Sequence, residues 1–113
     1  MKALITGVGG FCGPHLVSRL RRELNIEIAG LDLHAAHSPG LELDRYFQCD
    51  VTDAGQVSSV VQEFVPDAIF HLAGLTGRSI AAALVYRVNV MSAVHVLESV
   101  RCHARNCRVL LVG

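Results

Sequence analysis

The sequence lacks an excess of charge of either sign. Its 113 residues carry 10 Lys and Arg against 10 Asp and Glu, and the isoelectric point is about 7.0. It contains no basic block of the kind that binds a phosphate backbone or an anionic lipid surface. These absences exclude strong electrostatic attraction to nucleic acid or to a membrane, so we expect neither as a partner.

Long hydrophobic runs are missing as well. The apolar runs are short and broken by polar residues, so we expect no transmembrane helix. The first of them follows Lys2 and is interrupted at Thr6, which makes it too short for a signal peptide. The 4 cysteines contain no CxxC pair. Without a secretory signal, we expect them to be reduced thiols in a cytoplasmic protein.

Metal-ligand patterns are weak. His34 and His37 form an HxxH pair in a loop, which lacks the fixed geometry that a helix gives to ligands four residues apart. Cys102, His103 and Cys107 lie near one another in the sequence, but their spacing matches no zinc site. We therefore expect no metal in this chain.

What the sequence does contain is a series of short, periodic apolar segments. Apolar residues make up 51% and charged residues 18%, which is typical of a globular chain, and the length suits a single domain over residues 1–113. Continuous apolar runs predict strands at 2–6, 26–31, 46–49, 68–72 and 109–112. Helical periodicity predicts helices at 11–24, 53–64 and 79–104, with a loop at 34–44.

This alternation predicts an α/β fold. Strands that are apolar on both faces are typical of a parallel sheet covered by helices on both faces, and right-handed crossovers then give the Rossmann-like strand order 3-2-1-4-5. Asp53 and Gln56 resemble a capping box at the start of the second helix. The apolar positions that we expect to face inward are Leu16, Val17, Leu20 and Leu24, then Val57, Val60, Val61 and Phe64, then Leu84, Val88, Met91, Leu97 and Val100.

A glycine-rich loop follows the first expected strand and opens the first expected helix. Gly7, Gly10 and Gly13 have a GxxGxxG spacing. In a dinucleotide-binding βαβ unit, the first glycine allows the tight turn, the second lets the backbone approach a pyrophosphate, and the third lets helix and strand pack closely. The amides from Gly10 to Cys12 would then point at the phosphates. The alternative is a glycine-rich turn that binds nothing.

Asp32 ends the second expected strand, at the place where a carboxylate accepts hydrogen bonds from the adenosine ribose hydroxyls. The same charge would repel a 2′-phosphate, and residues 33–44 contain no Arg or Lys to attract one. The sequence therefore favours NAD over NADP. The alternative is a solvated aspartate at the end of a strand.

Together these segments resemble the extended short-chain dehydrogenase/reductases, the NAD-dependent epimerase/dehydratase family of nucleotide-sugar enzymes. The stretch TGVGGFCG at 6–13 matches the TGxxGFxG signature of that family. Similar segments follow in the family's order over the rest of the chain: DVTD at 50–53, PDAIFHLAG at 66–74, the pair Asn89 and Val90, and VLLVG at 109–113. Cys12, Gly74 and Ser92 depart from the family's usual residues without arguing against the fold.

The resemblance also implies a set of cofactor-binding residues. In the family, the acidic residue and the next amide of the DVTD-like segment meet the adenine, and the HLAG-like segment runs under the nicotinamide half. The positions carried over to this sequence are Gly7, Gly10, Phe11, Cys12, Gly13, Asp32, Asp50, Val51, Leu72, Ala73, Gly74 and Asn89.

The catalytic residues of the family are not found in this sequence. The family uses a Tyr-x-x-x-Lys pair for proton transfer, but Lys2 is the single lysine, and Tyr46 and Tyr86 are followed four residues later by Asp50 and Val90. We therefore assign no catalytic residue and expect a chain that is incomplete relative to the family, either a fragment or a truncated reading frame. Such a chain lacks the nucleotide-sugar site of a complete protein.

Three interpretations remain open. The chain is the NAD-binding portion of a nucleotide-sugar enzyme, a non-catalytic module that binds NAD or ADP-ribose, or an inactive remnant that only folds. His71 falls in an apolar strand, which favours a core histidine over a catalytic base. The wide apolar face of residues 80–100 suits either packing on the sheet or a helical dimer. An apolar fifth strand at an open edge predicts self-association.

Overall fold

A computed structural model describes residues 1–35, 38–75 and 79–112. It contains a parallel sheet with the strand order β3-β2-β1-β4-β5, which confirms the predicted topology. The strands are β1 (Lys2–Thr6), β2 (Glu27–Asp32), β3 (Arg45–Gln48), β4 (Ala68–His71) and β5 (Arg108–Leu111). The helices are α1 (Cys12–Leu20), α2 (Ala54–Phe64), α3 (Ala82–Tyr86), the π-helix η1 (Arg87–Met91) and α4 (Ser92–His103).

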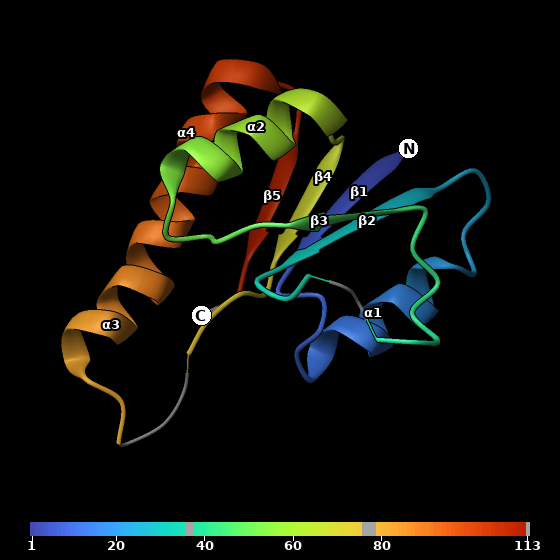
Figure 1. The fold of residues 1–113 in the computed structure, drawn as a ribbon. Coiled ribbons are helices and arrows are strands. Elements are labelled where there is room, and N and C mark those ends of the chain that lie inside the picture. Colours follow the sequence, from blue (N-terminus) through green and yellow to red (C-terminus); the bar gives the residue numbers. More distant parts are fainter. Residues whose placement is uncertain (36–37, 76–78, 113) are drawn as a thin grey trace.

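Helices cover both faces of the sheet, as predicted. Figure 1 shows α2 and α4 side by side on one face and α1 on the other. The core under α2 and α4 includes Leu4, Leu31, Phe64, Ile69 and Val96, all of which are buried. The core under α1 is smaller and is built around Ile5, Val8, Val17 and Ile28. Alternate residues of the same strands thus supply both cores, which is why the strands read as continuous apolar runs.

The start of α2 is fixed to the end of β3. The Asp53 carboxylate accepts a hydrogen bond from the Gln56 amide at 3.1 Å, as expected of a helix N-cap. The Gln56 side chain in turn accepts from the Asp50 amide at 2.8 Å. The helix ends at Val65, whose φ of 48° is left-handed. The cap therefore holds in place the segment between β3 and α2.

The predicted helix over 11–24 is too long. In the structure α1 ends at Leu20, and the amides of Arg22 and Glu23 bond to carbonyls three residues back, which tightens the chain into turns. Asn25 then takes a left-handed conformation with a φ of 59°, which asparagine tolerates better than most residues. Leu24, predicted to face the core, is 90% exposed because it lies beyond the helix.

The helix predicted over 79–104 is present as one uninterrupted helical run from Ala82 to His103, but it is not α-helical throughout. It begins at Ala82 and passes through the π-helix η1 before α4 starts. Leu84 and Leu97, expected to face inward, are 40% and 45% exposed. Ser92 and Ser99 are buried on this segment instead. Their hydroxyls have hydrogen-bond partners inside the protein, so a search for apolar periodicity alone misplaces the inward face.

At its far edge the sheet ends on exposed apolar residues. β5 pairs with β4 on one side, and within the described ranges no other strand pairs with it. Leu110 and Leu111 are 54% and 44% exposed. Leu110 pairs with Phe70, whose side chain belongs to the α1 face. The predicted apolar edge is thus confirmed, while self-association through it remains a prediction.

None of the helices in the described part of the chain is both long enough and apolar enough to span a bilayer.

Candidate functional site

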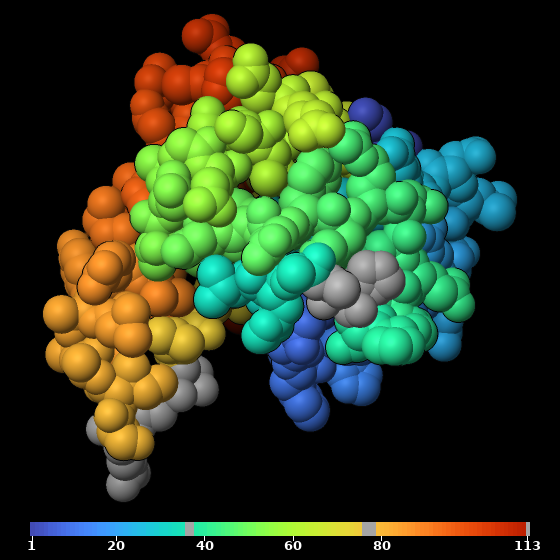
Figure 2. All heavy atoms as spheres, in the orientation of Figure 1, coloured from blue at the N-terminus to red at the C-terminus, as the bar shows by residue number. Residues whose placement is uncertain are grey.

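A cavity of about 630 Å³ opens at the carboxyl ends of the parallel strands, where open α/β sheets bind their ligands. Figure 2 shows the surface hollowed at the lower edge of the molecule, between the orange segment of α3 and the blue loop after β1. The loops after β1, β2, β3 and β4 all contribute to its wall, together with α3 and η1. The lining residues are Gly7, Gly9, Gly10, Leu31, Asp32, Leu33, His34, Cys49, Asp50, Val51, Thr52, Leu72, Ala73, Gly74, Leu75, Leu84, Arg87 and Val88.

The glycine loop makes two close approaches that only glycine permits. Gly7 has a φ of +67°, and a Cβ on it would lie 2.8 Å from the Ala73 backbone. Gly13 packs so tightly that a Cβ would lie 1.9 Å from the Val8 carbonyl oxygen. The tight turn at Gly7 and the close helix packing at Gly13 are therefore confirmed as structural roles. Binding of a dinucleotide by these residues remains a prediction.

The amide of Gly10 is used within the loop. It donates to the Gly7 carbonyl at 3.0 Å, so the expectation that this amide points at a phosphate is wrong. The next amides belong to Phe11, the N-cap of α1, and to Cys12, its first residue. No side chain caps this helix in the described chain, so its first turn presents amide donors and the positive end of the helix dipole.

Asp32 is held at the cavity wall by two backbone amides. Its Oδ2 accepts from the Gly9 amide at 2.8 Å, and its Oδ1 accepts from the Leu33 amide at 2.7 Å. A Cβ on Gly9 would lie 2.8 Å from that carboxylate oxygen. Sequence reasoning missed Gly9 because it falls outside the GxxGxxG spacing. The paired glycines 9 and 10 were the available signal that two positions of this loop need to be small.

Asp50 lies at the end of β3 on the same wall. Its Oδ1 accepts from the Thr52 hydroxyl at 2.7 Å and from the Thr52 amide at 2.9 Å. These two hydrogen bonds hold the pKa of Asp50 below its usual value, with a smaller contribution from the charge of Arg87. Asp50 is therefore a stable carboxylate beside Val51, whose carbonyl is 3.0 Å from the His95 Nδ1.

The loop after β4 is fastened from two sides. The Ala73 amide donates to the Thr6 hydroxyl oxygen at 3.2 Å. On the other side, Asn89 of η1 accepts from the Leu75 amide at 2.7 Å and donates to the Leu75 carbonyl at 2.9 Å. A Cβ on Gly74 would lie 3.2 Å from the Asn89 Oδ1, so this glycine leaves room for the clamp. Asn89 thus holds Leu75, a residue of the cavity wall, without lining the cavity itself.

His71 is a core residue at the centre of a hydrogen-bond chain. It is 3% exposed, its Nδ1 lies 2.7 Å from the Thr6 hydroxyl, and its Nε2 lies 2.9 Å from the Ser92 hydroxyl. Burial lowers the pKa of His71. A neutral ring satisfies the chain when the Thr6 hydroxyl donates to Nδ1 and the Nε2 hydrogen is donated to Ser92. The ring therefore joins β1, β4 and α4 directly beneath the Ala73 loop.

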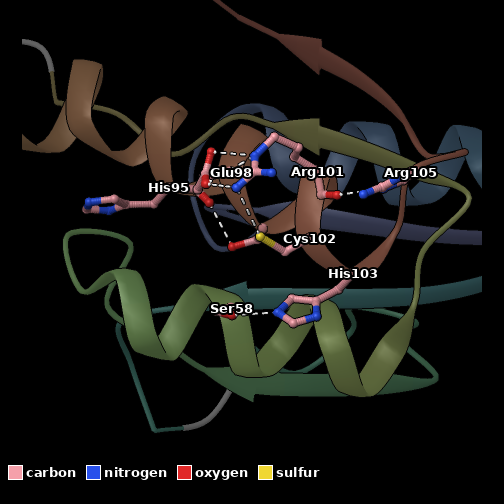
Figure 3. Close-up of polar contacts among 8 residues, drawn as sticks. Ser58, His95, Glu98, Arg101, Cys102, His103 and Arg105 are labelled. Atoms are coloured by element: carbon pink, nitrogen blue, oxygen red, sulfur yellow. Dashed lines mark hydrogen bonds and ion pairs between the residues drawn. The ribbon is translucent and has the colours of Figure 1, made fainter.

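The other candidate sites are not brought together. His103 points toward α2 and lies 2.9 Å from the Ser58 hydroxyl, while Cys102 lies beside the Arg101 guanidinium (Figure 3). His37 falls outside the described residues, so the HxxH pair is described only in part. In the ranges with described placement, no group of three or more His, Cys, Asp or Glu side chains is arranged to hold a metal.

Most of the cofactor-binding positions predicted from the sequence meet at this cavity. Those that line it are Gly7, Gly10, Asp32, Asp50, Val51, Leu72, Ala73 and Gly74. Those that do not are Phe11, Cys12, Gly13 and Asn89, which lie in or beside the helices that frame it. Sequence reasoning did not place Arg87 here, because the family-like pair Asn89 and Val90 beside it does not include it. Only the fold brings it to the wall.

Comparison with known proteins gives a consistent set of similarities. A family model described as the NAD-dependent epimerase/dehydratase family matches residues 3–113. CDP-paratose 2-epimerase of Salmonella typhi is 28% identical over 122 residues, which cover 97% of this chain and 36% of that protein. GDP-6-deoxy-D-talose 4-dehydrogenase of Aggregatibacter actinomycetemcomitans is 34% identical over 76 residues, 67% of this chain and 22% of that protein.

Solved structures show the same fold. UDP-glucose 4-epimerase of Thermus thermophilus in complex with NAD superposes with a TM-score of 0.76 at 28% identity, covering 90% of this chain and 34% of that one. A uronate dehydrogenase variant of Agrobacterium tumefaciens complexed with NAD superposes with a TM-score of 0.74 at 25% identity, covering 90% and 37%. The chain thus spans roughly a third or less of the length of these relatives.

Proposed function

The chain belongs to the NAD-dependent epimerase/dehydratase family, and from that premise we propose that it forms the NAD-binding portion of a nucleotide-sugar epimerase, dehydratase or reductase. One observation carries the proposal: the glycine loop, Asp32, Asp50 and the loop after β4 converge on one cavity at the carboxyl ends of the strands. These four segments are separated in the sequence, and the parallel sheet brings them to the one edge at which open α/β sheets bind their ligands.

The residues of the cavity fit a dinucleotide. The turn at Gly7 and the first turn of α1 suit a pyrophosphate, since that turn has no side-chain cap and offers amide donors and the positive end of the helix dipole. Asp32, already oriented by two amides, has the acceptor oxygens that ribose hydroxyls need. Asp50 and the backbone of Val51 suit the amino group and ring nitrogen of an adenine. The loop from Leu72 to Gly74 would then lie along the nicotinamide half.

We propose NAD in preference to NADP. The Asp32 carboxylate is fixed at the wall, so a 2′-phosphate at the adenosine ribose would face a negative charge that does not move away. Two of the similar structures were determined in complex with NAD, which supports the same choice.

We propose no proton-transfer residue within these 113 residues. In a complete family protein, NAD would supply hydride-accepting chemistry toward a sugar carbon, and a tyrosine assisted by a lysine would move the proton. Here burial and the nearby charge of Asp32 raise the pKa of Tyr46, which opposes its use as a base. Lys2 bonds to the Phe64 carbonyl at 3.0 Å, at the amino end of β1 and thus away from the cavity.

The proposed NAD site is tested by calorimetry with NAD, NADP and ADP-ribose on the 113-residue chain. We expect binding of NAD and ADP-ribose and weaker binding of NADP. A folded sample that gives no heat with any of the three would overturn the proposal and leave the inactive remnant.

The alternative of a non-catalytic module is distinguished by adding UDP- and GDP-sugars to the NAD-bound chain and separating the nucleotide sugars by chromatography, because an epimerase or dehydratase returns the hydride to the sugar and leaves no net change in absorbance at 340 nm. Turnover would show that the chain carries its own chemistry. Binding of NAD without turnover is expected both for the proposed NAD-binding portion and for a module that never catalyses. The two interpretations then differ in what longer products of the same gene bind. We expect such a product to bind a nucleotide sugar if the chain is the NAD-binding portion of an enzyme, and not to bind one if the chain is a non-catalytic module.

Assembly and location also belong to the proposal. We propose that the chain self-associates through the exposed apolar residues of β5. We also propose that it is a cytoplasmic protein, which agrees with its 4 cysteines, all free thiols in the structure. Nucleotide sugars are proposed as substrates of the complete protein only.

A further inference from the structure

Arg87 is a charged residue of the cavity that neither the sequence motifs nor the family resemblance assigns. It lies in the π-helix η1, next to Val88, and both contribute to the cavity wall. The side chain is exposed, so neither packing nor burial explains its position. π-helical turns are rare and occur frequently at functional sites. The question is therefore what an arginine on this wall would contact.

The charged side chains of the cavity wall show that a dinucleotide would need a positive charge there. Asp32 and Asp50 place two carboxylates on the wall, and a dinucleotide brings two phosphate charges of the same sign. Among the described lining residues, Arg87 is the sole lysine or arginine. The amides of the glycine loop and the dipole of α1 supply partial positive charges only. A full positive charge at Arg87 would offset this repulsion more than any other group described there.

Arg87 lies toward one end of the cavity. It interacts electrostatically with Asp50, at the carboxyl end of β3, and shares the wall with Thr52. The loop that would follow the nicotinamide half comes after β4, which is separated from β3 by β2 and β1 in the sheet order. The position beside Asp50 is the one proposed for the adenine. Arg87 therefore faces the adenosine half of the ligand.

We propose that Arg87 is a cofactor-binding residue whose guanidinium attracts the adenosine-side phosphate of a dinucleotide and balances the carboxylates of Asp32 and Asp50. The inference rests on the proposed NAD site and adds to it a residue that acts through charge. Arginine is suited to this task because it stays protonated and forms directed hydrogen bonds to phosphate oxygens.

The test compares Arg87→Ala, Arg87→Lys and Arg101→Ala in the 113-residue chain. Arg101 is the matched control, because it is an exposed arginine on α4 that pairs with Glu98 away from the cavity. Binding of NAD is measured by calorimetry, and binding of AMP and nicotinamide mononucleotide by NMR titration. Circular dichroism checks that each variant is folded.

We expect Arg87→Ala to raise the Kd for NAD about 10-fold, as loss of one charge-assisted hydrogen bond does. Arg87→Lys should keep most of the affinity, and Arg101→Ala should keep all of it. AMP should lose affinity in Arg87→Ala, and nicotinamide mononucleotide should not. The affinity of the wild-type chain should fall more steeply with salt than that of Arg87→Ala.

Three results would overturn the inference. The first is unchanged NAD binding in Arg87→Ala, which would leave the NAD site intact and remove only the role of Arg87. The second is an equal loss in Arg101→Ala, which would indicate a general effect of charge. The third is a loss confined to nicotinamide mononucleotide, which would put Arg87 at the other half. A wild-type chain that binds no NAD would overturn both proposals, and it is recognised before any variant is made.

Discussion

The two sides of the sheet differ in how many internal contacts hold them. We call the side of β1 and β2 the built side and the side of β5 the open side. On the side of β1 and β2, both faces are covered, the loops are fastened to one another, and the cavity opens at the strand ends. On the side of β5, the apolar residues Leu110, Leu111 and Val112 are about half exposed. The comparison teaches that contacts within the chain hold the side of the cavity, whereas apolar side chains stay exposed at the β5 edge of the described structure.

The tightest contact of the built side gives the largest expected effect. Gly13→Ala would place a Cβ 1.9 Å from the Val8 carbonyl oxygen, and backbone would have to move. We expect a loss of more than about 3 kcal/mol in the free energy of unfolding, measured by thermal melting. Gly55→Ala in α2 is the control, since its Cβ would come no nearer than 3.3 Å to the Asp53 Oδ1 and alanine favours a helix. Equal melting temperatures for both variants would contradict the close packing.

Asp32 tests whether the built side recognises the ribose. Asp32→Ala removes both the ribose acceptor and the charge that opposes a 2′-phosphate, so we expect NAD affinity to fall about 10-fold and NADP affinity to change less. Calorimetry with both cofactors measures the ratio. The control is Asp67→Asn, an exposed aspartate at the other end of the sheet. Asp53→Ala is unsuitable as a control because it removes a helix cap. Equal losses for NAD and NADP would remove the argument for cofactor choice.

His71 makes the stability of the built side depend on pH. Burial lowers the pKa of the folded ring, so the unfolded chain binds more protons once the pH falls below the unfolded pKa of about 6.5. The contribution is complete above that value and is lost as the pH falls toward the folded pKa. Between pH 7.5 and 5.5 we expect a loss of about 1 kcal/mol, measured by urea unfolding. The slope should flatten in His71→Gln and persist in His15→Gln, whose side chain is exposed.

The open side gives the smallest expected effect on stability. Leu110→Lys replaces a side chain that is 54% exposed, so the free energy of unfolding should change by less than about 0.5 kcal/mol. If β5 is the surface of self-association, light scattering should show a smaller species than for the wild-type chain. Val94→Lys, on the exposed face of α4, tests the helical alternative in the same assay. A wild-type chain that is monomeric at high concentration would contradict both.

The sequence predicted the sheet well because each strand is a separate apolar run bounded by turns. It predicted the positions of Gly7, Asp32 and Asp50 on the cavity for a related reason, since each lies at or just after the carboxyl end of a strand and parallel strands end at the same edge. The segment from α3 to α4 was harder to predict. A π-helix has no simple sequence signature, and the buried Ser92 and Ser99 are polar. Arg87 lies on that segment, so its position at the cavity could not be predicted from the sequence.

The pairing of Asn89 with Leu75 has a mechanical consequence. One amide side chain meets both the N–H and the C=O of a single residue, which is what a neighbouring strand would do. The chain after β4 thus gains a side-chain pairing four residues beyond the end of the strand, and η1 supplies it. The Leu75 backbone is consequently tethered to η1 as well as to the strand before it. The helix therefore contacts the wall of the cavity directly through Leu75, independently of the hydrogen bonds of the sheet.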